Sequence, residues 1–446
     1  MNNRKILMPM KAKTLINSMI NIKKLQQNLL LCSLIFLSSC TRLFIAPIEK
    51  QEIVVKKNIQ IGKSCTAAQK SISLLGKYKN DILLFNEFSK AYYHQFQPVE
   101  LFSLLALTHM NFFPHKITPF SKFQIITNLN GELKIFDFPL PINNNNKKSQ
   151  ANFLIGLQTL LKTYKSKRDL KDLAKILDNK FSQSIPVNKE LATFLKENRA
   201  TLYAQKVFND TFFKADMLIE EKETFKKINF KNLIKSFKIT ETKKNYLSHL
   251  FPFENETLLK AGWTVKCNVD LHLYRHEIYP LSDNFVPIPF GISFPNRTFI
   301  LGVANQKVSS IKPIKKTFLV QGISKSNKSV FCHLTRKKQE NIYLFSTKGK
   351  DPGQYIFQAL KSKTFNNLQD LQQLIENYRT LHLNNPHRVL YESTRGTPES
   401  LNKLLSQTKP VYHTRSLGNI WAYSDLKNGF QTFITDSRTN SYLLCH

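Results

Sequence analysis

The chain has 446 residues, a hydrophobic content of 42%, and 65 Lys and Arg against 31 Asp and Glu, which gives a net charge of +34. Its length permits two or three domains of ~150 residues each, with a sizeable core. A charge this large favours contact with anionic surfaces such as lipid head groups, lipopolysaccharide or wall polymers. The alternative is that the high lysine content reflects biased codon usage and not a binding role. The lysines are dispersed, so nucleic-acid binding is not favoured.

The first 39 residues have the layout of an export signal. A basic segment without acids precedes the apolar run 29–37, and small residues follow. The run is too short to span a bilayer, which needs ~20 residues, so a cleaved signal is predicted rather than a transmembrane helix. Met1 gives a long basic region and Met19 a leader of ordinary length, and both starts stay open.

The leader ends in Leu37-Ser38-Ser39-Cys40, which resembles the lipobox of bacterial lipoproteins. The resemblance implies cleavage before Cys40, acylation of that cysteine and stable membrane attachment, because two or more acyl chains anchor a protein stably. In lipoproteins of this kind an Asp directly after the cysteine often signals retention in the inner membrane. Thr41 stands at this position instead, so the resemblance favours the outer membrane. The alternative is a plain cleaved signal. Residues 40–62 are then the lipidated cysteine and a tether.

Residues 63–255 are expected to form a mainly α-helical domain, because their apolar residues recur at spacings of three and four. One exception is a β-hairpin near 123–137, where Asn130-Gly131 supplies the turn chemistry. We expect a long helix from 198 to 225. We also expect a basic, aromatic-rich helix within 226–244, which packs on the bundle or lies on a membrane surface.

Residues 256–446 are expected to form an α+β domain. The sequence 265–273 alternates apolar and polar residues, as a half-buried strand does, and several short apolar segments follow. Helices return after residue 351, and Thr397 and Pro398 have the types of an N-cap and a first helical residue. The loop 436–440 is predicted to close a hairpin. The fold class is therefore α+β, mostly helical at first and then mainly antiparallel β.

Four cysteines remain outside the leader and the anchor, at positions 65, 267, 332 and 445. An even set in an oxidising compartment predicts at least one disulfide. A Cys267–Cys332 or a Cys332–Cys445 bond would join strands of the β-rich half. The Cys332-His333 and Cys445-His446 pairs raise a zinc alternative, but the disulfide interpretation is simpler and no metal is predicted.

Asp270, His272 and His276 share one face of a predicted strand, because strand side chains alternate. Two imidazoles and a carboxylate could hold zinc or act as a general base with an orienting acid. The alternative is a solvent-facing strand side.

Arg395, Gly396 and Thr397 lie between a predicted strand and a helix start. Helix N-termini bind anions, so these residues are candidates for a phosphate or sulfate pocket. The alternative is an ordinary capped turn.

Sequence signatures of common hydrolases, such as Gly-x-Ser-x-Gly and His-Glu-x-x-His, are absent from the chain. We therefore expect a non-catalytic, lipid-anchored envelope protein without a cofactor. Its partners would be the membrane, through the lipid anchor, and an anionic envelope polymer or another envelope protein. The alternative is an envelope hydrolase that uses Asp270, His272 and His276.

Overall fold

A computed structural model describes residues 72–445 of the chain. It leaves out 130, 139–150, 238, 240–246, 249–252, 255–261, 269–287, 296, 324–329, 337–339, 347–351, 363–366, 385–386, 408–409, 415–416, 427–430 and 440. All the described elements belong to one compact unit, Glu52–His446.

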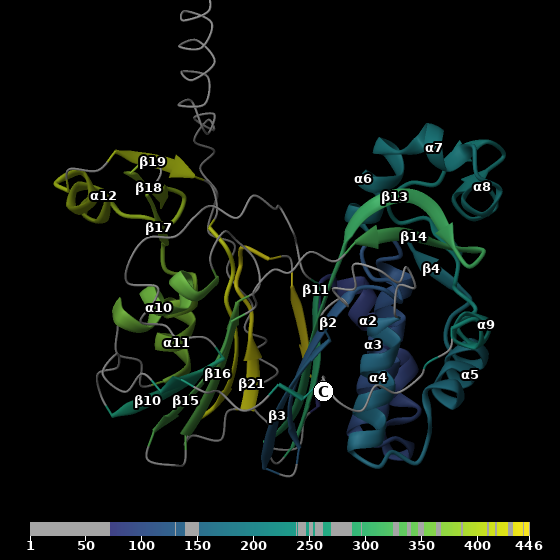
Figure 1. The fold of residues 1–446 in the computed structure, drawn as a ribbon, viewed down its shortest axis with the longest axis horizontal. Helices are drawn as coiled ribbons and strands as arrows, with labels where there is room; N and C mark the ends of the chain where they lie inside the picture. The colour runs from purple at the N-terminus through teal and green to yellow at the C-terminus, as the bar shows by residue number, and fades with distance from the viewer. Residues whose placement is uncertain are drawn as a thin grey trace, which may run out of the picture. The chain divides into compact units, whose positions relative to one another are not determined.

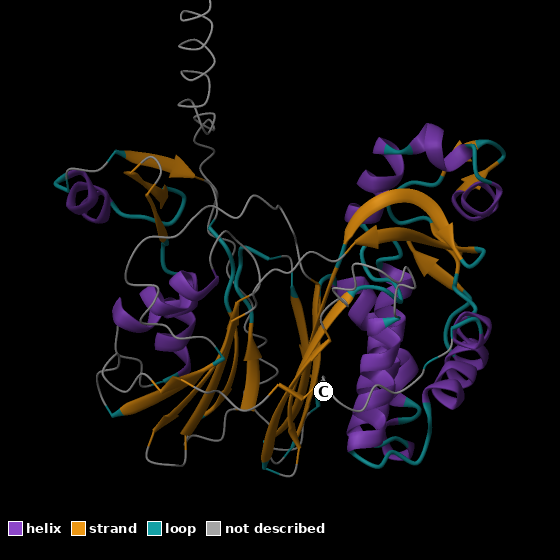
Figure 2. Ribbon diagram, in the orientation of Figure 1, coloured by secondary structure: helices purple, strands orange, loops and turns teal. Residues whose placement is uncertain are grey.

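The unit is an α+β fold built on two large antiparallel sheets (Figures 1 and 2). The seven-stranded sheet runs, from edge to edge, β22 (Tyr442–Cys445), β1 (Ser73–Gly76), β11 (Ile288–Phe294), β12 (Thr298–Asn305), β2 (Lys122–Leu129), β3 (Glu132–Phe138) and β8 (Leu247–Ser248). The six-stranded sheet runs β21 (Gln431–Ile434), β20 (Trp421–Asp425), β16 (Glu340–Ser346), β15 (Val330–Arg336), β10 (Trp263–Cys267) and β9 (Phe253–Glu254).

Helices cover the outer face of each sheet, so the unit has four layers in the order α/β/β/α (Figure 1). The seven-stranded sheet is covered by α2 (Lys79–Lys90), α3 (Pro98–Phe112) and α4 (Asn152–Thr163), with α5 (Leu170–Lys180) and α9 (Phe230–Lys235) behind them. The six-stranded sheet carries α10 (Pro352–Ser362) and α11 (Leu368–Glu376).

The two sheets pack through their inner faces, and the residues of β2 show how the alternation works. Phe123 and Ile125 belong to the core beneath the helices, whereas Ile126 belongs to the core between the sheets. Aromatic rings fill this inner core: the ring of Phe299 lies 4.2 Å from that of Tyr423 and 4.9 Å from that of Tyr343. Both faces of the central strands are therefore buried.

Smaller elements surround the four layers. They are the 3₁₀ turn η2 (Tyr93–Gln95), α6 (Lys189–Glu197), α7 (Arg199–Tyr203), α8 (Lys206–Phe212), the two-stranded pairs β4 (Ser184–Pro186) with β7 (Thr224–Lys226), β5 (Phe213–Lys214) with β6 (Met217–Leu218) and β13 (Lys307–Ile314) with β14 (Thr317–Ile323), and the three-stranded sheet β17 (Thr380–Asn384), β18 (His387–Glu392) and β19 (Val411–Thr414) with α12 (Pro398–Leu405).

Several local predictions are confirmed. The α+β class is correct, and β2 pairs with β3 as the expected hairpin, with Gly131 at φ 77°. The Thr397 side chain accepts a hydrogen bond from the Ser400 amide and caps α12, with Pro398 in the first turn. Cys267 and Cys332 form a disulfide between facing positions of β10 and β15. Cys445 is also disulfide-bonded.

Two local predictions are wrong, and a third is confirmed in part. The long helix of 198–225 is instead α7, α8 and three short strands, because Ala215 and Asp216 adopt positive φ and turn the chain. The helix expected within 226–244 is confirmed over Phe230–Lys235, where α9 buries Phe230, Leu233 and Ile234 in the core and so packs on the bundle. The loop 436–440 does not close a hairpin, because β21 pairs with β20 in one sheet and β22 with β1 in the other. The chain therefore crosses between the sheets here.

The two halves of the chain share the seven-stranded sheet. Its strands β1, β2, β3 and β8 precede residue 255, the expected domain boundary, whereas β11, β12 and β22 follow it. Local periodicity distinguished a helical from a β-rich half correctly, but it carries no information on which strands pair across long separations.

Candidate functional site

Polar side chains lie between the sheets where β2 begins and β3 ends. Gln124 lies opposite Asp137 in the pairing of β2 with β3. Each is two residues from an isoleucine of the inner core, Ile126 or Ile135, so both face the space between the sheets. Burial raises the pKa of Asp137 and lowers that of Lys122, and the opposite charges of this pair limit both shifts. The pair is therefore a strongly desolvated acid and base, of the kind that marks candidate sites.

The hydroxyl groups of the two sheets are engaged within the fold. Ser73 and Ser293 hydrogen-bond to each other, and Ser346 Oγ donates to the Asn419 carbonyl oxygen at 2.6 Å. Across the strands that the structure describes, no Ser or Thr side chain is hydrogen-bonded to the side chain of a described His, Lys, Asp or Glu. The described cysteines are oxidised. The described strands therefore hold no hydroxyl group paired with a side-chain base, which is one of the arrangements that activate a nucleophile for acyl transfer.

A buried ion network lies at the end of α11. Arg379 Nη2 donates to Asp436 Oδ2 at 2.6 Å, and Arg438 contacts both Asp436 at 3.0 Å and Glu392 at 2.5 Å. Burial alone would raise the pKa of Asp436, but the two arginines outweigh it and hold the pKa at about 2. The carboxylate is therefore ionised and fully paired.

Arg395 extends this network. Its guanidinium pairs with Glu376 and donates to Ser437 Oγ. With Arg395 and Glu376 included, the network contains equal numbers of guanidinium and carboxylate groups, and Arg395 has little charge left for a bound anion. Gly396 packs against Tyr391, whose hydroxyl hydrogen-bonds to Ser400. Thr397 caps α12, so an anion at residues 395–397 stays a prediction.

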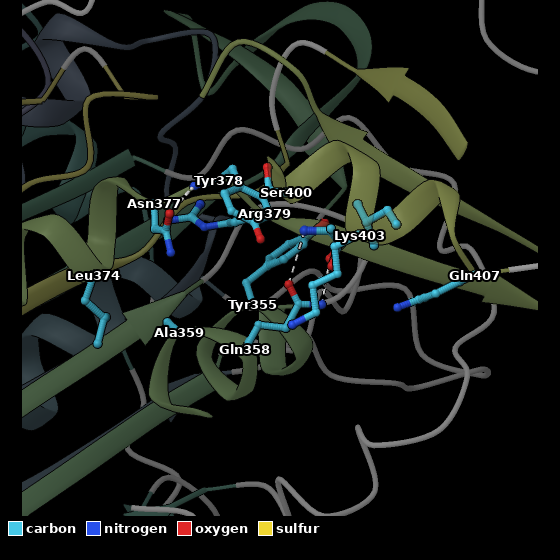
Figure 3. Close-up of a pocket in the computed structure, with 12 residues that line it drawn as sticks. Tyr355, Gln358, Ala359, Leu374, Asn377, Tyr378, Arg379, Ser400, Lys403 and Gln407 are labelled. Atoms are coloured by element: carbon cyan, nitrogen blue, oxygen red, sulfur yellow. Dashed lines mark hydrogen bonds between the residues drawn. The ribbon is translucent and has the colours of Figure 1, made fainter. Parts of the chain in front are cut away.

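A pocket of about 350 Å³ lies between α10, α11 and α12 (Figure 3). Its apolar lining comes from Tyr355, Ala359, Leu374 and Leu404. Its cationic lining consists of Arg379, whose guanidinium is held by the ion network, and Lys403 from α12. None of the described residues that line it is Asp or Glu.

The other predicted site residues lie outside the described residues: Cys40, Asp270, His272 and His276. Within the part of the chain that is described, no group of three or more His, Cys, Asp and Glu side chains is placed to hold a metal ion. The described helices include none that is both long enough and apolar enough to cross a bilayer.

The sequence analysis missed the ion network and the pocket. One signal was present: Glu392 follows the apolar strand residues 389–391, and it is fully buried. A charged residue at the end of a buried strand indicates a buried partner, but the partners Arg438 and Arg395 could not be assigned without the fold.

No protein-family model matches the chain, and no curated protein is similar to it in sequence. Solved structures are similar in fold. The crystal structure of cephalosporin acylase from Bacillus halodurans superimposes with a TM-score of 0.55, covering 84% of this chain and 96% of that one at 10% identity. Two structures of the protein LmbA2991 give TM-scores of 0.57 and 0.56, each covering 84% of this chain and 98% of theirs at 9% identity.

At 9 to 10% identity these similarities show the fold alone. The fold is the α/β/β/α sandwich that this chain shares with an acylase over most of both chains. Function resides in sites that a fold carries and not in the fold itself, so the site geometry has to decide between a catalytic and a binding role.

Proposed function

We propose that this chain is a lipid-anchored protein of the bacterial envelope in which an acylase-type sandwich binds a partner and does not cleave one. The observation that carries the proposal is the state of the nucleophiles on the described strands: the cysteines are oxidised, and no Ser or Thr side chain is hydrogen-bonded to a His, Lys, Asp or Glu side chain. Aromatic rings occupy the core between the sheets. A binding role requires neither a nucleophile nor an open interior.

Export is supported by the leader and by the cystines. Disulfides persist in oxidising compartments and are rare in the bacterial cytosol. Cys267–Cys332 and the bond of Cys445 therefore agree with a protein that folds outside the inner membrane. The lipobox resemblance of residues 37–40 supplies the anchor.

The anchor is tested by labelling cells that express the full chain with radioactive palmitate. We expect label in the wild type and in a Thr41→Ala control, and none after Cys40→Ala. Fractionation of the envelope then assigns the membrane. An unlabelled wild type, or a protein that stays in the cytosol with its leader, would contradict the proposal.

Catalysis is tested with the purified mature protein and a panel of acyl amides, including phenylacetyl-p-nitroanilide and glutaryl-p-nitroanilide. An acylase of the same fold serves as the positive control. We expect no turnover above buffer and no labelling by an electrophilic probe for activated Ser, Thr or Cys. Turnover that survives further purification would refute the non-catalytic role.

Amide hydrolysis is the second candidate, and the fold similarity to cephalosporin acylase favours it. If turnover appears, two sets of residues compete for the role of base. His272→Ala tests the predicted Asp270, His272 and His276 face. Lys122→Met with Asp137→Asn tests the desolvated pair between the sheets. Loss of activity in one variant alone, with unfolding unchanged, identifies the site.

A further inference from the structure

The pocket between α10, α11 and α12 has a distinct charge pattern (Figure 3). Arg379 and Lys403 line it, and no Asp or Glu is among its described lining residues. The charge of Arg379 is balanced by Asp436 behind the pocket wall. Lys403 lies on the exposed side of α12 and forms no ion pair with a described residue. The pocket therefore has a surplus of one positive charge.

Arg379 also has hydrogen-bond donors to spare. A guanidinium carries five N–H groups. Those of Arg379 that bond to described residues are on its terminal nitrogens: Nη1 donates to the Leu417 carbonyl oxygen, and Nη2 donates to Ile375 and Asp436. The Nε hydrogen and one Nη1 hydrogen have no partner among the described residues, and the side chain is only 4% exposed. These two donors are not fully enclosed, so water or the acceptor of a ligand can reach them.

The remaining lining is apolar. The ring of Tyr355, the methyl group of Ala359 and the side chains of Leu374 and Leu404 border the same space. A volume of about 350 Å³ is at the small end of the ~300–1,000 Å³ typical of ligand pockets. An apolar lining combined with a few convergent polar groups is the usual composition of such sites.

We propose that this pocket binds a small monocarboxylate with an apolar or aromatic body. The carboxylate lies between the Lys403 ammonium group and the spare Arg379 donors, and the apolar body packs on Leu374, Leu404 and the Tyr355 ring. The surplus of one charge selects a monoanion over a polyanion. The inference rests on the proposed binding function, and the two fail separately, because catalysis is measured as product release and this site as a dissociation constant.

The test uses the mature protein and three probes of one shape: phenylacetate, phenylacetamide and phenethylamine. Calorimetric titration is expected to show binding of phenylacetate, weaker binding of the neutral amide and none of the cation. Lys403→Gln removes the ammonium group and is expected to weaken phenylacetate about tenfold, or by ~1.4 kcal/mol, and to leave phenylacetamide unchanged. Lys175→Gln, on the exposed face of α5, is the matched control.

A second variant tests the location. Ala359→Leu places a larger side chain in the pocket and is expected to weaken all the probes that bind, without moving the Lys403 dependence. Equal affinity for phenylacetate and phenylacetamide would overturn the proposal. So would an effect of Lys403→Gln no larger than that of Lys175→Gln, or the absence of binding by phenylacetate. Catalytic turnover with an unchanged Lys403 effect would refute the proposed function and leave this site standing.

Discussion

Arg379 and Asp436 form an ion pair of 2.6 Å that joins the end of α11 to the loop between β21 and β22. That loop carries the chain from the six-stranded sheet to the edge of the seven-stranded one. The same Asp436 carboxylate accepts a hydrogen bond of 2.9 Å from the backbone amide of Ile420. One buried carboxylate therefore fixes the crossing between the sheets.

Removal of this charge should destabilise the fold strongly. Asp436→Asn keeps the shape of the side chain but leaves Arg379 and Arg438 buried without their common counter-ion. Breaking a buried pair from one side costs about 3–5 kcal/mol. Urea unfolding of the variant against Glu221→Gln, an exposed acid, measures the difference. A loss below about 1 kcal/mol would mean that the network contributes little.

The disulfide between Cys267 and Cys332 spans a sequence separation of 65 residues. A cross-link of this length restricts the unfolded chain, and the chain-entropy relation gives a stabilisation of about 4 kcal/mol. The double variant Cys267→Ala with Cys332→Ala is expected to lose about that much in guanidinium unfolding. Cys445 keeps its own bond in this variant, so oxidised proteins are compared throughout. Equal unfolding midpoints would show that strand packing alone holds β10 on β15.

Two glycines separate steric from conformational causes. A Cβ at Gly396 would collide with the hydroxyl oxygen of Tyr391, a side chain that is buried and bonded to Ser400. A Cβ at Gly131 meets nothing within 4 Å, but its φ is +77°. We expect Gly396→Ala to cost about 1–3 kcal/mol through overpacking and Gly131→Ala about 1 kcal/mol through backbone strain. Thermal unfolding of both ranks them. If Gly131→Ala is the worse variant, Tyr391 moves easily.

Local chemistry predicted much of the fold. The hairpin at Gly131, the cap at Thr397 and the α+β class follow from spacing and turn residues. The pairing of β22 with β1 does not, because more than 360 residues separate the two strands in the chain. The layers could not be predicted either, because the central strands are buried on both faces. Phe123, Ile125 and Ile126 are all apolar, although they face different cores.

The candidate pocket was harder to predict, because its lining comes from three helices, from the segments that follow α11 and α12 and from the start of β17. Arg379 follows α11, and its partner Asp436 lies 57 residues later. The sequence predicted an anion site at Arg395 because this residue lies near the start of a helix. In the fold its guanidinium forms an ion pair with Glu376 instead. Charge in a sequence shows that an ion has to be placed, whereas the fold decides whether it meets a partner or a ligand.

Asp81 in the first turn of α2 is buried, and no described residue hydrogen-bonds its Oδ2. Burial, aided by the negative charge of Glu190, raises the pKa of Asp81 to about 8. In the unfolded chain the pKa is ~3.9. Between these values the unfolded state releases a proton that the folded state keeps, so folding stability falls as pH rises. The neighbouring lysines, Lys77 and Lys116, pair with Glu190.

The wild type is therefore expected to lose stability relative to Asp81→Asn between pH 4 and pH 8, at up to ~1.4 kcal/mol per pH unit. At pH values well below the unfolded pKa of ~3.9 the carboxyl is neutral in both states, so the difference between the proteins is constant. Glu190 acts in the opposite sense, because burial would raise its pKa but the two lysines lower it to about 2. Its contribution is present above its unfolded pKa and is lost as pH falls. Because both proteins keep Glu190, its effect cancels in the comparison. Urea unfolding at each pH gives the difference, and a line without slope from pH 4 to pH 8 would show that Asp81 is ionised in the folded protein.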